Sequence, residues 1–360
     1  MKIVNNSVKV EKELISIAST ESKTTKNKNL IIIILSIISL SIFLLSFTIG
    51  RYGIPLSQLF NIVIGKLFNL PVTWSKTEEM VLFQIRVPRI FAAVLIGTAL
   101  SVSGAAYQGL FKNPMVSPDI LGASSGAGMG AVIGLLLSFN SIAVQAMAFI
   151  MGVIAVILTY AISNIIGKDK GSIVLLVLTG VVVSNIFSAI ISITKYVADP
   201  DNKLPAITFW LMGGLSSISN SDILMFLIPF SIGIIPIMAI RWKINILSFG
   251  DEEAKSLGVD TKKMRIVTII CATMLTAASV AIAGMISWIG LIIPHIARLI
   301  VGPNYKVLLP VSIIVGSSFL LLVDNFARNM FQMEIPLGIL TSIIGAPLFL
   351  YLLLKGKKAW

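Results

Sequence analysis

Stretches without a charged residue dominate this sequence, and their lengths predict its elements. A helix needs about 20 apolar residues to cross the hydrocarbon core of a bilayer. Six stretches fit one crossing each: residues 30–49, 90–111, 171–194, 223–240, 307–323 and 335–354. Two more, 120–167 and 266–297, are long enough for two crossings each. The pattern therefore predicts an all-α, polytopic membrane protein with ten transmembrane helices.

Both of the longer stretches contain residues suited to a turn. In 120–167 the helices are expected to part near Phe139, Asn140 and Ser141, and in 266–297 at Gly284. Asparagine, serine and glycine favour turns because they form local hydrogen bonds or adopt left-handed backbone angles. Ten crossings also place both chain ends on the same side of the membrane.

Composition supports the membrane class and indicates the orientation. The chain is 56% apolar with mean hydropathy +0.96, too hydrophobic for a soluble protein of 360 residues. Its net charge of +12 lies at the ends of apolar stretches, which argues against nucleic acid binding. An inside N-terminus places 20 Lys and Arg in cytoplasmic segments and 8 outside, in agreement with the positive-inside rule. We therefore expect residues 1–29 to be a disordered cytoplasmic tail rather than a secretory signal, and residues 30–360 to be the transmembrane domain.

One charged island, residues 248–265, interrupts the apolar pattern, with eight charged residues in eighteen. Its acidic triplet, Asp251, Glu252 and Glu253, suits the positive end of a short helix, and Gly258 suits the end of that helix. Asp260 can then cap a second helix. The segment is predicted to be a cytoplasmic knob, either a solvated loop or a docking surface for a soluble partner.

Arginines gather at the other side of the predicted membrane. Arg86 and Arg89 flank Pro88 at the outer end of the second crossing, and Arg328 follows the ninth at the same level. Such arginines often anchor to lipid headgroups. Alternatively, their guanidinium groups can pair with carboxylates of a soluble partner, for which their planar geometry is suited.

Two stripes of residues lie within the predicted spans. Glycines at a spacing of four allow close helix packing; they are Gly122, Gly126, Gly130 and Gly134. This glycine run lacks the Lys followed by Ser or Thr of a phosphate-binding loop, so we expect no nucleotide site in this chain. The fifth span carries a polar stripe that either lines a water-filled path or bonds to its own helix; its members are Thr179, Ser184, Asn185, Ser188 and Ser192.

Ionisable residues are nearly absent from the spans, although a proton- or sodium-driven carrier usually needs them there. Cys271 is alone and His295 has no second His or Cys near it in sequence, so neither is expected to hold a metal. We predict no catalytic residues, since paired acids or an activated nucleophile at one depth are lacking. Transport by this chain would need energy from a partner; an ATP-independent secondary carrier or channel is the alternative.

The sequence resembles a known family in several ordered blocks. RVPRIFAAVLIGTALSVSGAAYQGLFKNPMVSPDILG at 86–122 is similar to the signature of FecCD-type permeases of ABC importers, which serve ferric siderophores, haem and cobalamin. GMISWIGLIIPHIAR at 284–298, LLP at 308–310 and IPLGILTSIIGAPLF at 335–349 also resemble this family. The likeness spans about residues 30–356.

The resemblance implies a function and its partners. Such a subunit has ten helices, pairs with a second permease subunit, and works with two cytoplasmic ATPases and an extracytoplasmic substrate-binding protein in a bacterial cell membrane. ATP and Mg would be bound by the ATPases, and this chain would hold no cofactor. A ferric siderophore is the expected substrate, with haem or cobalamin as alternatives, and a homodimer and a heterodimer stay equally open.

The resemblance also implies residue roles. Arg86, Arg89 and Arg328 would receive acidic residues of the binding protein, and the fifth and tenth spans would enclose the central path. A cytoplasmic gate would lie near the start of the fifth span, at Ser172, Ile173 and Val174. The coupling contact with the ATPase would be made by the knob, through Asp251, Glu252, Glu253, Ala254, Leu257, Gly258, Val259 and Asp260.

Overall fold

The computed structural model describes residues 29–167 and 173–356, and across them the chain forms helices and loops with no strand. Eight helices are long and apolar enough to cross a membrane; they are Asn29–Ser46, Lys76–Phe111, Ser141–Gly167, Ile173–Val197, Asn220–Phe249, Thr261–Ala283, Tyr305–Asn329 and Leu337–Leu354. Two of the ten predicted crossings correspond to shorter apolar helices, Ala123–Leu136 and Ile289–Val301. The all-α membrane class is confirmed, and in the described residues the ten predicted crossings correspond to eight full-length spans and two shorter helices.

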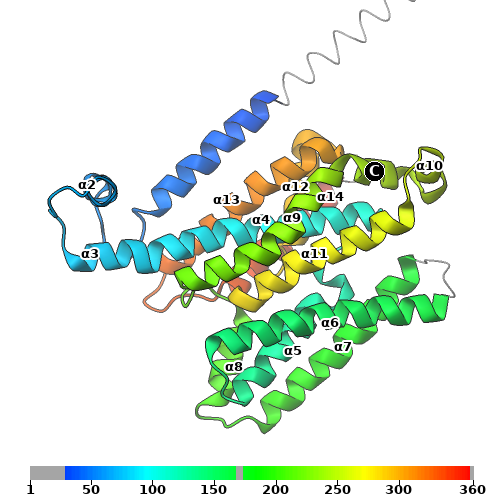
Figure 1. The fold of residues 1–360 in the computed structure, drawn as a ribbon, viewed down its shortest axis with the longest axis horizontal. Helices are drawn as coiled ribbons and strands as arrows, with labels where there is room; N and C mark the ends of the chain where they lie inside the picture. The colour runs from blue at the N-terminus through cyan, green and yellow to red at the C-terminus, as the bar shows by residue number, and fades with distance from the viewer. Residues whose placement is uncertain (1–28, 168–172, 357–360) are drawn as a thin grey trace, which may run out of the picture.

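The helices that follow Asn29–Ser46 keep the labels of Figure 1. They are α2 (Leu56–Leu67), α3 (Lys76–Met80), the π-helical turn η1 (Val81–Arg86), α4 (Val87–Phe111), the 3₁₀ turn η2 (Pro118–Leu121), α5 (Ala123–Leu136), α6 (Ser141–Gly167), α7 (Ile173–Val197), α8 (Lys203–Met212), α9 (Asn220–Phe249), α10 (Asp251–Ser256), α11 (Thr261–Ala283), α12 (Ile289–Val301), α13 (Tyr305–Asn329) and α14 (Leu337–Gly356).

The helices form two groups (Figure 1). One contains α4, α9, α11, α12, α13 and α14, and the other contains α5, α6, α7 and α8. Helix α11 packs against α4 and α9 in the first group and against α5 and α6 in the second. It therefore joins the two groups.

Helix α4 lies at the centre of the first group, where α9, α11, α12 and α13 surround it. Its side chains are almost all buried from Pro88 onward. A helix buried on every side needs small residues where its neighbours approach, and α4 has them at Gly97 and Gly104. A side-chain carbon on Gly97 would collide with the backbone carbonyl of Gly316 in α13, and one on Gly104 with that of Gly290 in α12.

Replacement of Gly104 by alanine is expected to destabilise the fold. The new methyl group has to displace a backbone carbonyl rather than a flexible side chain, and overpacking of this kind costs about 1–3 kcal/mol. Thermal unfolding of the purified protein measures the effect. Gly214→Ala is the matched control, because nothing lies within 4 Å of its added carbon; equal melting of both variants would contradict the tight packing of α4.

Two predicted turns are confirmed, and one span begins earlier than expected. Helices α5 and α6 are separated by residues 137–140, and α11 ends at Gly284. The second span begins at Lys76 rather than residue 90 and continues through α3 and η1 into α4. The wider π-helical turn ends just before Pro88, whose ring and missing N–H do not fit a regular helix interior.

The glycine ladder is only partly a packing stripe. Gly126 and Gly130 lie against the backbone of α6, next to the carbonyls of Met151 and Met147, and Gly134 approaches Val144 more loosely. Gly122 is not in the helix, contrary to the prediction. It caps α5 with φ +88°, a left-handed angle that glycine adopts without strain.

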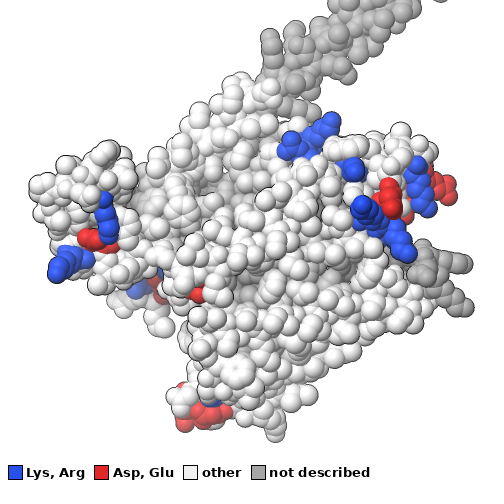
Figure 2. Space-filling view, viewed as in Figure 1, with Lys and Arg blue, Asp and Glu red and all other residues white. Residues whose placement is uncertain are grey.

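Charged side chains mark the two ends of the bundle. Figure 2 shows blue and red atoms over α2 and α3 and around the α7–α8 turn on one side, over α10 on the other, and a largely white surface between them. We call these two sides the α3 end and the α10 end. A surface without charges between two charged ends is the pattern expected of a membrane-embedded bundle.

Candidate functional site

The charged island folds as a short helix, a glycine turn and the capped start of the next helix, as predicted. Helix α10 begins with its three acidic residues and ends where Gly258 adopts φ +77° and donates its N–H to the Lys255 carbonyl at 2.9 Å. The Val259 N–H then donates to the Ala254 carbonyl at 2.9 Å. The Asp260 carboxylate accepts from the N–H of Lys263 at 3.0 Å and so caps α11.

This knob is fixed to the bundle by its own small core and by ion pairs. Leu247, Ala254, Val259 and Met264 form a buried apolar cluster. Asp251 pairs with Arg265 at 2.9 Å and lies 3.7 Å from the ammonium group of Lys112, which follows α4. A push on α10 would therefore be transmitted to α4, α9 and α11 together.

Seven of the eight residues predicted to face a partner divide into a buried and an exposed set, and the eighth, Asp251, is half-buried in the ion pairs. Ala254 and Val259 are buried, so the expectation that they offer a contact surface is wrong; they hold the knob in place instead. Leu257 is the one large apolar side chain of the eight that is exposed, at 64%, and Phe249 elsewhere in the knob is also exposed. Polar or small residues surround it on the exposed side: Glu252, Glu253, Gly258 and Asp260.

The three arginines at the α3 end do not point outward. Arg86 is 3% exposed and donates to the backbone carbonyls of Phe47 and Tyr52, in the segment that follows the first span. A buried guanidinium group that is satisfied by main-chain carbonyls fixes the loop around it. This position does not leave Arg86 free for an acidic partner.

Arg89 and Arg328 belong to a buried charge cluster with Asp324 and Glu334. Asp324, fully buried, accepts from Nε of Arg89 at 2.9 Å and lies 3.1 Å from Nε of Arg328. Arg89 Nη1 also contacts the Glu334 carboxylate at 2.8 Å, and Arg328 donates to the side-chain oxygen of Asn325. The expectation of exposed docking groups is thus wrong for all three arginines, because each is buried and bonded to groups within the chain.

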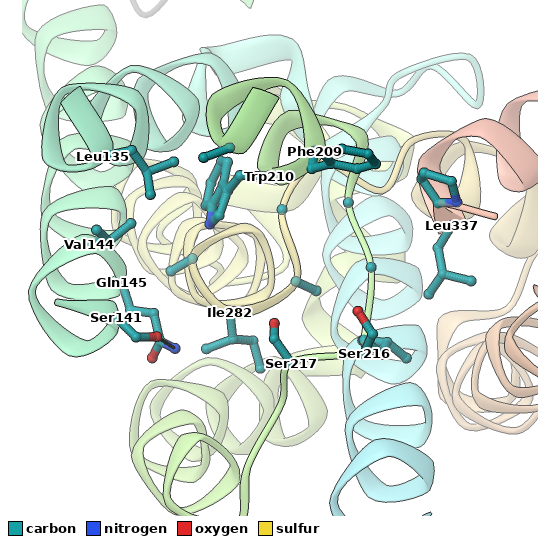
Figure 3. Close-up of a pocket in the computed structure, with 18 of the residues that line it drawn as sticks. Leu135, Ser141, Val144, Gln145, Phe209, Trp210, Ser216, Ser217, Ile282 and Leu337 are labelled. Carbon is teal, nitrogen blue, oxygen red and sulfur yellow. Dashed lines mark hydrogen bonds between the residues drawn. The ribbon is translucent and has the colours of Figure 1, made fainter. Parts of the chain in front are cut away.

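A cavity of about 450 Å³ adjoins this charge cluster at the α3 end (Figure 3). Arg89 and Glu334 contribute to its wall, and Figure 3 shows Trp210 and Phe209 of α8 on one side with Ser216 and Ser217 on the other. No pattern of residues predicted this cavity, although the glycine pair 213–214 was a signal for irregular backbone.

Close backbone contacts build the wall of this cavity. The Gly214 N–H donates to the Ala283 carbonyl at 2.8 Å, and the Leu337 N–H donates to the Gly213 carbonyl at 2.9 Å. Three segments that are distant in sequence therefore meet at this point: the end of α8, the end of α11 and the start of α14. Serine hydroxyls beside aromatic rings suit a solute with both polar and apolar faces.

The polar stripe of α7 is split between two environments. Thr179 is buried and Ser184 is half-buried, whereas Asn185 and Ser188 are exposed on the outer face of the helix. Ser192 donates to the carbonyl of Ser188 at 2.9 Å, which is the self-bonding alternative. A continuous surface stripe therefore includes Asn185 and Ser188, and excludes Thr179.

The predicted gate lies at the beginning of α7. Ser172 is outside the described residues. Ile173 is half-buried and Val174 is 67% exposed at the first two positions of the helix.

Several polar contacts between helices were missed by the sequence analysis. Ser103 of α4 lies 2.7 Å from the hydroxyl of Thr276 in α11, and Tyr107 lies 3.1 Å from that of Thr273. Their signal in the sequence was hydroxyl residues at helical spacing in two otherwise apolar stretches. Within the described ranges no group of three His, Cys, Asp or Glu residues is placed to hold a metal ion.

The fold described above has a central buried helix, long spans beside shorter apolar helices, and a charged knob between α9 and α11. The chain can now be compared with known proteins. The profile of the FecCD transport family matches residues 33–355. The chain belongs to this family. As a FecCD permease it is a multi-pass membrane subunit of an ABC importer, and the family works with ATPase and binding-protein partners.

Individual FecCD relatives cover most of the chain. The molybdate import system permease protein MolB of Haemophilus influenzae is 37% identical, with 91% of this chain and 94% of that protein covered. A probable iron chelatin transport system permease of Helicobacter pylori is 40% identical, with 78% and 84% covered. A solved structure described as an inward-facing metal-chelate type ABC transporter is 36% identical with a TM-score of 0.81, covering 90% of this chain and 99% of that one.

Proposed function

We propose that this FecCD permease passes an iron chelate from a binding protein to the cytoplasm. The transport is driven by ATPases that bind the knob. The observation that carries the proposal is the knob itself. It exposes Leu257 on a rigid support that is tied to α4, α9 and α11 through Asp251 and the small apolar core. An exposed apolar residue on a rigid helix end is a suitable contact for a soluble partner.

The orientation follows from the charge distribution. The α10 end, with its Lys and Arg, is proposed to face the cytoplasm of a bacterial cell. Both chain ends are proposed to be on that side as well, although residues 1–28 and 357–360 lie outside the described residues. The α3 end is then the docking face for the binding protein. Arg51, which is exposed there and donates to the Phe331 carbonyl at 3.0 Å, is a more accessible arginine than Arg86, Arg89 or Arg328.

The transport path is proposed to run along the exposed face of α7, between this subunit and a second permease subunit. Asn185 and Ser188 supply hydrogen bonds, and Val181, Val182 and Ile186 supply apolar surface on the same face. This mixture binds a large solute weakly rather than trapping it, which suits a conduit. Helix α14, the tenth predicted span, is the proposed opposite wall.

For the substrate, two chemical classes compete. A ferric siderophore leads, supported by the iron chelatin relative and by the structural relative described as metal-chelate type. Haem and cobalamin are alternatives that share a large, partly apolar surface. Molybdate, a small oxyanion, is the second class, supported by the Haemophilus influenzae relative.

The test is uptake into vesicles that contain the assembled transporter and ATP. Radiolabelled ferric siderophore, haem, cobalamin and molybdate are offered with the cognate binding protein outside. We expect ATP-dependent accumulation of the iron chelate and no accumulation with an ion gradient alone. Uptake of molybdate instead would contradict the proposed substrate. Uptake without ATP would contradict the proposed mechanism and indicate a secondary carrier.

Narrowing the path is expected to block uptake without disturbing the fold. Ser188→Trp adds bulk on an exposed face of α7, so we expect iron chelate uptake to fall at least tenfold while basal ATPase activity persists. Ser188→Ala is the matched control, because it removes the hydroxyl without adding volume, and it should keep most of the uptake. Full uptake by Ser188→Trp would show that the solute passes elsewhere.

A further inference from the structure

An apolar groove of about 390 Å³ runs between α6 and α11 on the outer surface of the bundle. Its walls are almost purely hydrocarbon; the lining residues are Val153, Val156, Ile157, Tyr160, Ala161, Ile266, Ile269, Ile270, Thr273 and Met274. None of the functional surfaces described above uses it. A groove of this kind accepts a flexible apolar chain better than a polar solute.

The depth of the groove matches one leaflet of the bilayer. On α11 it extends from Ile266 to Met274, which spans about 12 Å along the helix axis. This is the half of α11 nearer the α10 end, because the helix begins beside the knob at Thr261. The α6 wall, 153–161, lies in the half of α6 that ends at Gly167, nearer the same end.

Two lysines stand at the mouth of the groove. Lys262 is four residues before Ile266 and eight before Ile270, and Lys263 is three and seven residues before them. Residues at these spacings lie on one face of a helix, so the two lysines and the groove wall share one stripe of α11. Both lysines are exposed, and Figure 2 shows basic side chains gathered over α10 and the adjoining start of α11.

Two of the carboxylates nearby, Asp260 and Asp251, have contacts other than the ammonium groups of Lys262 and Lys263, whereas Glu252 and Glu253 of α10 are exposed. Asp260 accepts from the backbone N–H of Lys263, and Asp251 pairs with Arg265 and Lys112. No ion pair within 29–167 and 173–356 involves Lys262 or Lys263. Two ammonium groups above an apolar groove therefore present positive charge next to a site for hydrocarbon.

We propose that this groove binds an anionic phospholipid of the leaflet at the α10 end. One acyl chain lies between α6 and α11, and the phosphate is held by Lys262 and Lys263. The acyl chain lies in hydrocarbon both in the bilayer and in the groove, so the groove only positions it, and the two ammonium groups supply the preference for an anionic headgroup. The exposed flanks of both helices are continuous with the groove, with Ile157 and Ile270 on its rim, so lipid has open access from the bilayer.

Native mass spectrometry of the assembled transporter tests the site by counting the lipids retained after exchange into phosphatidylglycerol or phosphatidylcholine. The Lys262→Gln/Lys263→Gln variant is expected to bind phosphatidylglycerol about tenfold more weakly. Ala161→Trp, which fills the groove from an exposed position, is expected to weaken it similarly. The matched control, Lys243→Gln/Lys306→Gln, makes the same charge change at the α10 ends of α9 and α13 and should bind as the wild type does.

Three outcomes would overturn the proposal. Equal loss in the control variant would indicate diffuse attraction to basic residues, and equal retention of phosphatidylcholine would indicate ordinary surrounding lipid. A disulfide between Ile270→Cys residues of two copies would identify a second protein chain as the occupant. Because lipid retention is measured without transport, its failure is distinguishable from failure of the proposed import function.

Discussion

Replacing Asp324 with asparagine is expected to lower the free energy of unfolding by about 3–5 kcal/mol. Asp324 is fully buried and lies between Arg89 and Arg328, at 2.9 and 3.1 Å. Removal of its charge leaves two buried guanidinium groups close together, and an uncompensated buried charge is costly. Thermal unfolding of the purified transporter, followed by the fraction that stays monodisperse, measures the loss.

Glu334→Gln is the matched control for this change. Glu334 contacts the same Arg89 at 2.8 Å, but 35% of its side chain is exposed, so solvent screens the pair and the expected cost is below about 1 kcal/mol. Wild-type melting of the Asp324→Asn variant would show that the cluster does not stabilise the fold. It would also reopen the possibility that Arg89 and Arg328 are available to a partner.

Replacing Leu257 with aspartate is expected to abolish coupling between ATP hydrolysis and transport. Leu257 is an exposed apolar residue of the knob, and interface anchors of this kind contribute about 2 kcal/mol or more, equivalent to roughly 30-fold in affinity. We expect uptake to fall by a similar factor and the ATPase to copurify poorly. The fold is expected to persist, since the side chain contributes nothing to the buried cluster beneath it.

Lys255→Gln serves as the control for the knob, because it alters an exposed position of the same helix without removing apolar surface. It should leave uptake within about twofold of the wild type. If the Leu257→Asp variant copurifies with the ATPase and supports normal uptake, the proposed coupling role of this segment is contradicted.

Much of the fold could be predicted from charge-free stretches alone, because helices buried in lipid need long apolar runs. The same reasoning could not find α2 or α8, which are short and lie outside such runs. It also placed the second span too late, since charged residues at 76–89 suggested a loop. In the structure these residues continue the helix, and the π-helical turn accommodates the proline that seemed to start it.

The knob was predictable and the arginine cluster was not, for a physical reason. Helix caps are local, so Asp251, Gly258 and Asp260 define α10 and its neighbour from their order in the sequence. The partners of Arg89 are 235 and 245 residues away, and nothing in the sequence around it distinguishes a buried pair from an exposed anchor. The distinction requires the packing of α4 against α13 and the loop before α14.

The glycine contacts of α4 constrain how the molecule moves. With the backbones of Gly97 and Gly316, and of Gly104 and Gly290, in direct apposition, α4 cannot slide past α13 or α12 without a steric clash. Shear along these seams is therefore blocked, and α4, α12 and α13 travel as one rigid block. Any hinge has to lie outside it, in connectors such as 112–117, which leads from α4 toward α5, and 213–219, which leads from α8 to α9.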